Sequence, residues 1–213
     1  MGLPGQTDHP QVWEAIGRVA AACYNVRFYP QNLEARADAW LFGEHFFDPE
    51  KLLKGDGLDG VMAYHGFTAP VRAFVARRDR EGVPSLLDGR GLLAHLHEAW
   101  ARVGWSAWRR STLHVNTHDI PRLQTEAGGA AFELATALQL ALPGVPCLYY
   151  GDEIGLEGGA DPDNRRCMEW DEARWDRARL DHVRAWIARR RGSAALRRGG
   201  FVALGADEDV LAF

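Results

Sequence analysis

Acidic side chains follow short apolar segments of this sequence, where carboxylates could carry out acid–base chemistry. Three such segments end in acids: Glu44 follows residues 39–43, Asp119 follows residues 112–116, and Asp152 with Glu153 follows residues 147–150. If these segments are parallel strands of a βα barrel, the loops after them converge on one face. Convergent carboxylates are what glycoside hydrolysis requires, because one protonates the leaving oxygen while another attacks or activates water. The alternative for each acid is a structural one, since acids also favour helix N-termini.

His118 lies next to Asp119 and adds a donor that can bind a sugar hydroxyl. A loop histidine with a local hydrogen bond is the simpler interpretation from the residues alone. His95 and His97 look like a metal pair, but side chains two residues apart diverge on a helix. The glycines at 155–159 lack the spacing of a phosphate-binding loop. The sequence therefore predicts no metal site and no cofactor.

The elements that must position these acids alternate between strand-like and helix-like segments. The predicted strands cover residues 39–43, 60–64, 112–116 and 147–150, and the predicted helices cover residues 67–78, 91–108, 130–142 and 177–191. Such alternation indicates parallel βα units, so the predicted fold class is α/β. Residues 10–22 also predict a helix, and residues 23–37 are interpreted as an irregular insertion. Residues 201–213 alternate weakly, like the opening strands of a β-rich domain.

Composition and charge indicate a globular protein and favour neither a nucleic-acid nor a membrane partner. The 213 residues are 46% hydrophobic and 25% charged, and the net charge of −4 comes from interspersed acids and bases. Cys23, Cys147 and Cys167 have no metal-ligand or redox spacing, which favours reduced thiols. The first residues lack the pattern of a signal peptide, and no apolar segment approaches the roughly 20 residues of a membrane span. The prediction is a cytoplasmic protein.

Four longer segments carry a family resemblance: Gly43–Phe47 (GEHFF), Asn116–Arg122 (NTHDIPR), Pro143–Gly155 (PGVPCLYYGDEIG) and Asp161–Trp170 (DPDNRRCMEW). In that order they resemble the fifth-strand segment, the end of the seventh strand, the eighth strand with its loop, and the following loop of the α-amylase family of glycoside hydrolases. They occur in the order of the family and span most of the chain. Residues 43–46, 62–68 and 195–200 are most similar to the branch of maltodextrin glucosidases, neopullulanases and cyclomaltodextrinases.

The resemblance implies a retaining hydrolase of α-1,4-linked glucose oligomers, so the implied partner is an oligosaccharide. It also implies a role for each matching residue. Glu44 matches the general acid/base, Asp119 the carboxylate that stabilises the transition state, His118 its hydrogen-bonding neighbour, Arg165 an arginine at the floor of the glucose pocket, and Phe46 an aromatic platform for the leaving-group sugar. Asp152 and Glu153 match motif positions but are expected to orient loops. Members of this branch often dimerise, so a homo-oligomer is a further expectation.

The matching segments do not include the family's nucleophile. In the family this is an Asp on strand four, within a Gly-x-Arg-x-Asp segment that the sequence does not contain. We therefore expect residues 1–195 to form the C-terminal half of a TIM (β/α)8 barrel, strands five to eight, and residues 196–213 to begin a C-terminal β-domain. Such a piece of a maltodextrin hydrolase is expected to be inactive alone. The alternative is a non-catalytic, amylase-like scaffold or binding module.

Overall fold

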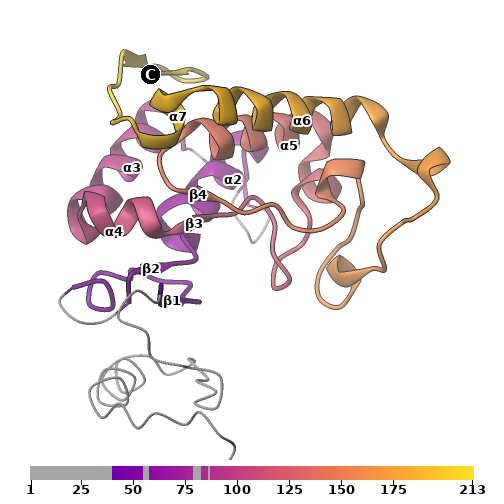
Figure 1. Cartoon of the computed structure of the whole chain (residues 1–213), viewed down its shortest axis with the longest axis horizontal. Coiled ribbons are helices and arrows are strands. Elements are labelled where there is room, and N and C mark those ends of the chain that lie inside the picture. Colours follow the sequence, from indigo (N-terminus) through magenta and orange to yellow (C-terminus); the bar gives the residue numbers. More distant parts are fainter. Residues whose placement is uncertain (1–39, 55–57, 79–82, 86) are drawn as a thin grey trace, which may run out of the picture.

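The computed structural model of the chain describes residues 40–54, 58–78, 83–85 and 87–213 (Figure 1). The predicted helix at 10–22 and the predicted insertion at 23–37 lie outside the described residues. Among the described helices, none combines the length and the apolar character that crossing a bilayer requires.

Four short parallel strands form the scaffold of the described chain: β1 (Phe42–Gly43), β2 (Gly60–Val61), β3 (Thr112–Leu113) and β4 (Val145–Pro146). β1 pairs with β2 and β3 pairs with β4, both in parallel. A parallel bridge between Met62 and Thr112 connects the two pairs, so the strands lie side by side in chain order. The sequential parallel order agrees with the alternating pattern, and helices connect β2 to β3 and β3 to β4, whereas the described residues between β1 and β2 form only turns and bends.

Helices directly follow β2 and β3, as the alternation predicts. The chain from β2 continues through a π-helical turn, η2 (Tyr64–Thr68), into α2 (Ala69–Ala76), and then α3 (Gly89–Val103) and α4 (Trp105–Arg110) lead to β3. After β3 comes α5 (Leu123–Ala141), which packs against α2 on one side and α6 (Arg177–Gly192) on the other (Figure 1). Asp88 and Asp176 cap α3 and α6, because each carboxylate accepts a hydrogen bond from a backbone N–H in the first turn.

All four strands are shorter than predicted, and Tyr64 lies in η2 rather than in the strand predicted over 60–64. Three further differences have a local cause or a shifted position. The helix predicted over 91–108 is two helices, because Gly104 has φ +79°, a conformation that glycine adopts without strain. α5 begins at Leu123 rather than at 130, with a non-helical break at Gly128, where φ is +84°. The fourth strand pairs at Val145–Pro146 rather than over 147–150, and a single further bond, from Cys147 N to Leu113 O at 2.9 Å, extends it.

The core lies between the strands and the helices that cover them. Its fully buried apolar side chains come from η2, α3, β3 and α5 and include Phe67, Leu92, Leu96, Leu113 and Phe132. Burying a side chain of this size stabilises a fold by about 1.5–3 kcal/mol. The core therefore holds the carboxyl ends of β1 and β3 at fixed positions.

A long segment with little regular structure connects β4 to α6 and extends away from the helices (orange in Figure 1). It contains three short 3₁₀ turns: η3 (Asp152–Ile154), η4 (Asp163–Arg165) and η5 (Glu172–Arg174). After α6 come α7 (Ala194–Arg198) and an antiparallel hairpin of β5 (Gly205–Ala206) and β6 (Leu211–Ala212). The hairpin packs on the start of α3, where Gly89 N donates to Glu208 O at 3.0 Å. Its membership of a separate β-domain stays a prediction.

Candidate active site

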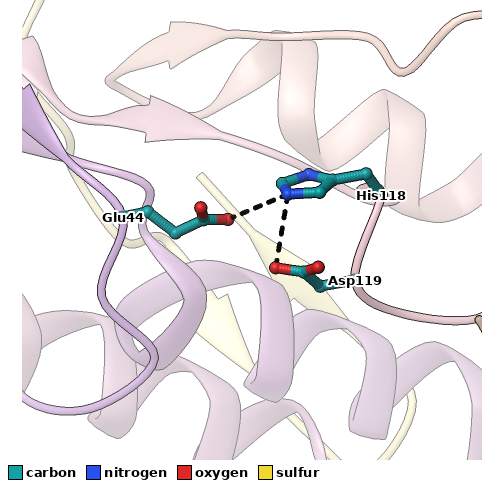
Figure 2. Close-up of side chains that lie close together, drawn as sticks. All are labelled: Glu44, His118 and Asp119. Atoms are coloured by element: carbon teal, nitrogen blue, oxygen red, sulfur yellow. Dashed lines mark ion pairs between the residues drawn. The ribbon is translucent and has the colours of Figure 1, made fainter. Parts of the chain in front are cut away.

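Three side chains from two loops converge at the carboxyl ends of β1 and β3. Glu44 directly follows β1, and His118 and Asp119 lie in the loop between β3 and α5. The Nε2 atom of His118 is 3.7 Å from Glu44 Oε1 and 3.4 Å from Asp119 Oδ2, so the imidazole lies between the two carboxyl groups (Figure 2). Their side chains are 31–45% exposed, which leaves all three accessible to a molecule from solvent. The predicted convergence of these residues is therefore present in the structure.

Arg165, in η4, lies on the Asp119 side of this group. Its Nε donates to the backbone oxygen of His118 at 3.0 Å, and its Nη2 lies 3.7 Å from Asp119 Oδ1 and 3.0 Å from Asp161 Oδ2. The guanidinium thus places a positive charge beside the Asp119 carboxylate. The structure brings Arg165 to the same site as the other predicted residues, from a loop more than forty residues further along the chain.

Phe46 reaches the site through Tyr64. The two rings stack with their centroids 4.2 Å apart at an interplanar angle of 24°, and Phe46 is half-buried. The Tyr64 hydroxyl lies 3.2 Å from Glu44 Oε1 and 2.9 Å from Thr117 Oγ1. A phenol has a single proton, so when Tyr64 donates to Glu44 it accepts from Thr117. Tyr64 therefore connects the loop that carries Glu44 to the loop that carries Asp119.

The surroundings of Glu44 favour its protonated form. Burial is the largest cause that raises the pKa of this carboxyl above its usual range, and the negative charge of Asp119 raises it further. The positive charge of His118 and the hydrogen bond from Tyr64 act in the opposite direction. A carboxyl group that keeps its proton to a higher pH is suited to donate that proton to a leaving group.

A buried polar network lies behind the loop that carries His118 and Asp119. Asn116 donates to Asp152 Oδ1 and to Gln124 Oε1, both at 2.9 Å, and accepts from the backbone N–H of Leu123 at 2.7 Å. Arg122 Nη1 donates to the same Asp152 oxygen at 2.7 Å.

Burial separates Asp152 and Arg122 from any substrate. Their side chains are 1% and 0% exposed. Burial raises the pKa of Asp152 to about 6, against the hydrogen bonds and the positive charge that surround it. Asp152 therefore holds the loop in place without reaching the group of exposed side chains.

Two residues of this site had no predicted role. Tyr64 ends the predicted strand 60–64, so the reasoning that singled out Glu44 at a strand end could also have found it. Asn164, in η4, is completely buried and donates to backbone carbonyls of the His118 loop. No local pattern indicates Asn164, because its contacts are 44 to 47 residues away in the chain.

The three exposed side chains could also hold a metal ion. One ligand atom each from Glu44, His118 and Asp119 lies within 4.8 Å of the others. Carboxylate and imidazole ligands together suit several divalent metals. The expectation of a metal-free site can be tested with a chelator.

Comparison with known proteins identifies the family. The alpha-amylase catalytic-domain family matches residues 5–191. The chain is 36% identical over 187 residues to a cyclomaltodextrinase from Geobacillus thermopakistaniensis (strain MAS1), covering 86% of this chain and 30% of the relative. It is 34% identical over 167 residues to a maltogenic alpha-amylase from Bacillus acidopullulyticus, covering 78% of this chain and 27% of the relative.

Solved structures agree with these sequence matches. The ligand-free cyclic alpha-maltosyl-(1→6)-maltose hydrolase from Arthrobacter globiformis superposes with a TM-score of 0.71 at 33% identity, over 80% of this chain and 38% of the other. The chain thus spans about a third of the length of these relatives, whose fold is the TIM barrel of α-amylase-family enzymes. On both sequence and fold, the chain belongs to the α-amylase catalytic-domain family.

Proposed function

We propose that this chain supplies the acid-bearing part of the active site of a retaining hydrolase that cleaves α-1,4-linked glucose oligomers. The observation that supports this most is the group of Glu44 and Asp119 with His118 between them, at the carboxyl ends of parallel strands. In TIM-barrel enzymes catalytic groups lie at this face. The names of the relatives, a cyclomaltodextrinase and a maltogenic amylase, support an α-glucan as the substrate.

The environments of the two carboxyl groups support different roles. Glu44 is the general acid, because burial and the neighbouring Asp119 raise its pKa. Asp119 is the stabilising carboxylate, since the positive guanidinium of Arg165 lies 3.7 Å from its Oδ1 and holds it in place beside His118. A fixed negative charge gains most when positive charge develops on the sugar ring in the transition state.

The other predicted residues bind the sugar in this proposal. His118 presents its imidazole between the carboxyl groups, where it can donate to a hydroxyl of the reacting glucose. Arg165 closes the glucose pocket beside Asp119, and Phe46 offers an aromatic face to the leaving-group sugar next to Tyr64. Sugars stack well on such faces because their C–H groups are apolar.

The catalytic nucleophile is expected to come from residues outside these 213. A retaining mechanism needs a carboxylate about 5 Å from the acid, and in the family it lies in a Gly-x-Arg-x-Asp segment that is missing from this sequence. The strands β1 to β4 would then be strands five to eight of the barrel. We expect the 213 residues alone to release no glucose from α-glucosides.

The test compares two proteins on maltotriose. One is the 213-residue chain and the other is the gene product read in frame upstream of Met1, each with Glu44 and with Glu44→Gln. We expect hydrolysis only by the longer product, with a Gly-x-Arg-x-Asp segment in the added residues, and its loss in Glu44→Gln. Turnover by the 213-residue chain that needs Glu44 would contradict the assignment of the nucleophile.

A non-catalytic module that binds α-glucans is the second candidate. The same missing segment favours it, because such a protein has no need of a nucleophile. Calorimetry with maltotriose separates the two candidates. Binding without hydrolysis, in every version of the gene product, would support the module and exclude the hydrolase.

A further inference from the structure

The loop that carries His118 and Asp119 has an unusual set of backbone partners. It has no regular structure between β3 and α5, yet side chains bind its carbonyl groups at six positions: His114, Val115, Thr117, His118, Ile120 and Pro121. Four side chains make these bonds: Thr68 binds His114 O, Arg165 shares His118 O, and Arg72 and Asn164 make the others. Arg72 of α2 holds the two ends of the loop, and Asn164 of η4 holds its middle.

The Asn164 amide makes the contacts closest to the exposed carboxylate. Its Nδ2 lies 2.7 Å from His118 O, 3.0 Å from Ile120 O and 3.4 Å from Thr117 O. An amide has two protons, so the two shorter contacts are the strong ones and the third is shared. The two strong bonds hold the residue before Asp119 and the residue after it.

Asn164 is itself fixed from behind. Its side chain is 0% exposed, and its backbone oxygen accepts from Arg122 Nε at 3.1 Å. Gly158 packs so closely that a Cβ built on it would lie 2.6 Å from the Asn164 Cα. The backbone N–H of Arg122 in turn donates to Gly158 O at 2.9 Å. The amide therefore has little freedom to follow the loop.

We propose that Asn164 is a positioning residue, whose side-chain amide sets the place of Asp119 and His118 relative to Glu44. It touches neither of the two carboxylates and acts through the backbone on both sides of Asp119. The catalytic consequence rests on the proposed function. The effect on the loop does not.

A purely structural role is the alternative, and Gln139 offers a matched control for it. Gln139 is also an amide with 0% exposure, and its Nε2 donates to Leu113 O at 2.7 Å and Cys147 O at 2.8 Å. It holds the backbone of β3 and β4 and not the loop. Replacing it should destabilise the fold to a similar degree and leave the site in place.

The experiment compares Asn164→Ala and Gln139→Ala in the gene product that carries this chain. Hydrogen exchange should show amides 117–120 losing protection by at least about tenfold in Asn164→Ala, while protection there is unchanged in Gln139→Ala. With maltotriose we expect kcat to fall about 10- to 100-fold in Asn164→Ala with KM changed less than about threefold, because a misplaced group costs rate rather than binding. Gln139→Ala should keep kcat within about twofold.

The outcomes separate the two proposals. Unchanged protection of residues 117–120 in Asn164→Ala, or equal kcat losses in both variants, would overturn the positioning role. If the parent protein does not hydrolyse α-glucans, the proposed function fails, and the exchange experiment still decides the inference. If Asn164→Ala does not fold, Asn164→Ser leaves a smaller cavity and is measured in the same way.

Discussion

The two loops that form the site are held in opposite ways. The loop after β3 is anchored by the side chains of Arg72, Asn164 and Arg165, which bind its backbone at several positions. In the described structure, Glu44 Oε1 accepts from the Tyr64 hydroxyl at 3.2 Å and lies 3.7 Å from His118 Nε2, and the Glu44 side chain is 40% exposed. The site therefore combines a rigid side that carries Asp119 with a lightly held side that carries Glu44.

This difference matches what the two carboxyl groups would have to do. A stabilising carboxylate keeps its charge throughout the reaction, and its effect depends on not having to reorient. A general acid must give up its proton to the leaving group and take one back from water, which requires access and a tunable pKa. Rigid support suits the first role, and the exchangeable side-chain contacts of Glu44 suit the second.

The largest effect is expected on the lightly held side. In an active protein that contains this chain, Glu44→Gln should lower kcat about 10³-fold on maltotriose, because a positioned acid contributes about 10²- to 10⁴-fold. A glucoside with an activated aryl leaving group needs no protonation, so its cleavage should suffer much less. Equal losses on the two substrates, measured by product release, would remove Glu44 from the acid role.

On the rigid side, Asp119→Asn should lower kcat about 10²-fold and raise KM by less, because the charge acts mainly in the transition state. Asp161→Asn is the matched control, since Asp161 also contacts Arg165 but is not in the group around His118. We expect the control to stay within about threefold of the parent protein. A raised KM at constant kcat in Asp119→Asn would indicate simple substrate positioning.

Removing the Tyr64 hydroxyl, which contacts both loops, should lower activity less than either of these changes. Tyr64→Phe removes the hydroxyl that reaches Glu44 and Thr117, and the loss of one net hydrogen bond corresponds to about 3- to 10-fold in kcat/KM. Tyr150→Phe removes a hydroxyl that binds the backbone oxygen of Arg166 and serves as its control. Steady-state kinetics in which both variants lose the same activity would show that Tyr64 does not link the loops.

The smallest effect concerns pH. The alkaline limb of kcat/KM follows the pKa of the acid, because activity falls as Glu44 loses its proton. Asp119 raises this pKa and the Tyr64 hydrogen bond lowers it. The limb should therefore move to lower pH in Asp119→Asn and to higher pH in Tyr64→Phe, by less than about one unit at this degree of exposure. Shifts of the limb in the same direction in both variants would contradict these two causes of the Glu44 pKa shift.

Addition of a chelator tests the alternative of a metal ion held by Glu44, His118 and Asp119. The sequence predicts no metal at this site, so EDTA should leave kcat within about twofold. A loss of activity that Zn²⁺ or Mn²⁺ restores would replace the carboxylate mechanism with a metal-assisted one.

Part of this site could be predicted because strand ends are visible in the sequence. Apolar segments followed by Glu44 and Asp119 predicted that the two acids would meet, and they do. α6 was also predicted almost to the residue, since Asp176 caps it and its apolar positions recur at helical spacing. Both predictions rest on neighbours in the sequence.

The remainder depends on contacts between distant segments. Nothing near Asn164 or Arg72 indicates that their side chains bind a loop more than forty residues away. Composition alone predicted one helix across Gly104 and a later start for α5. In the structure α3 ends before Gly104, and α5 starts earlier but is interrupted at Gly128. The domain boundaries, the cytoplasmic location and the roles of the site residues stay predictions.

The hydrogen bonds that hold the His118 loop also affect the order in which parts of the chain fold. Arg72 and Asn164 meet it across sequence separations of 43 to 49 residues. Contacts this distant form late in folding, because the entropy of closing a long loop opposes them until the intervening segments have packed. The arrangement of Asp119 should therefore form after α2 and α5, because the segments between Arg72 and Asn164 have to pack first.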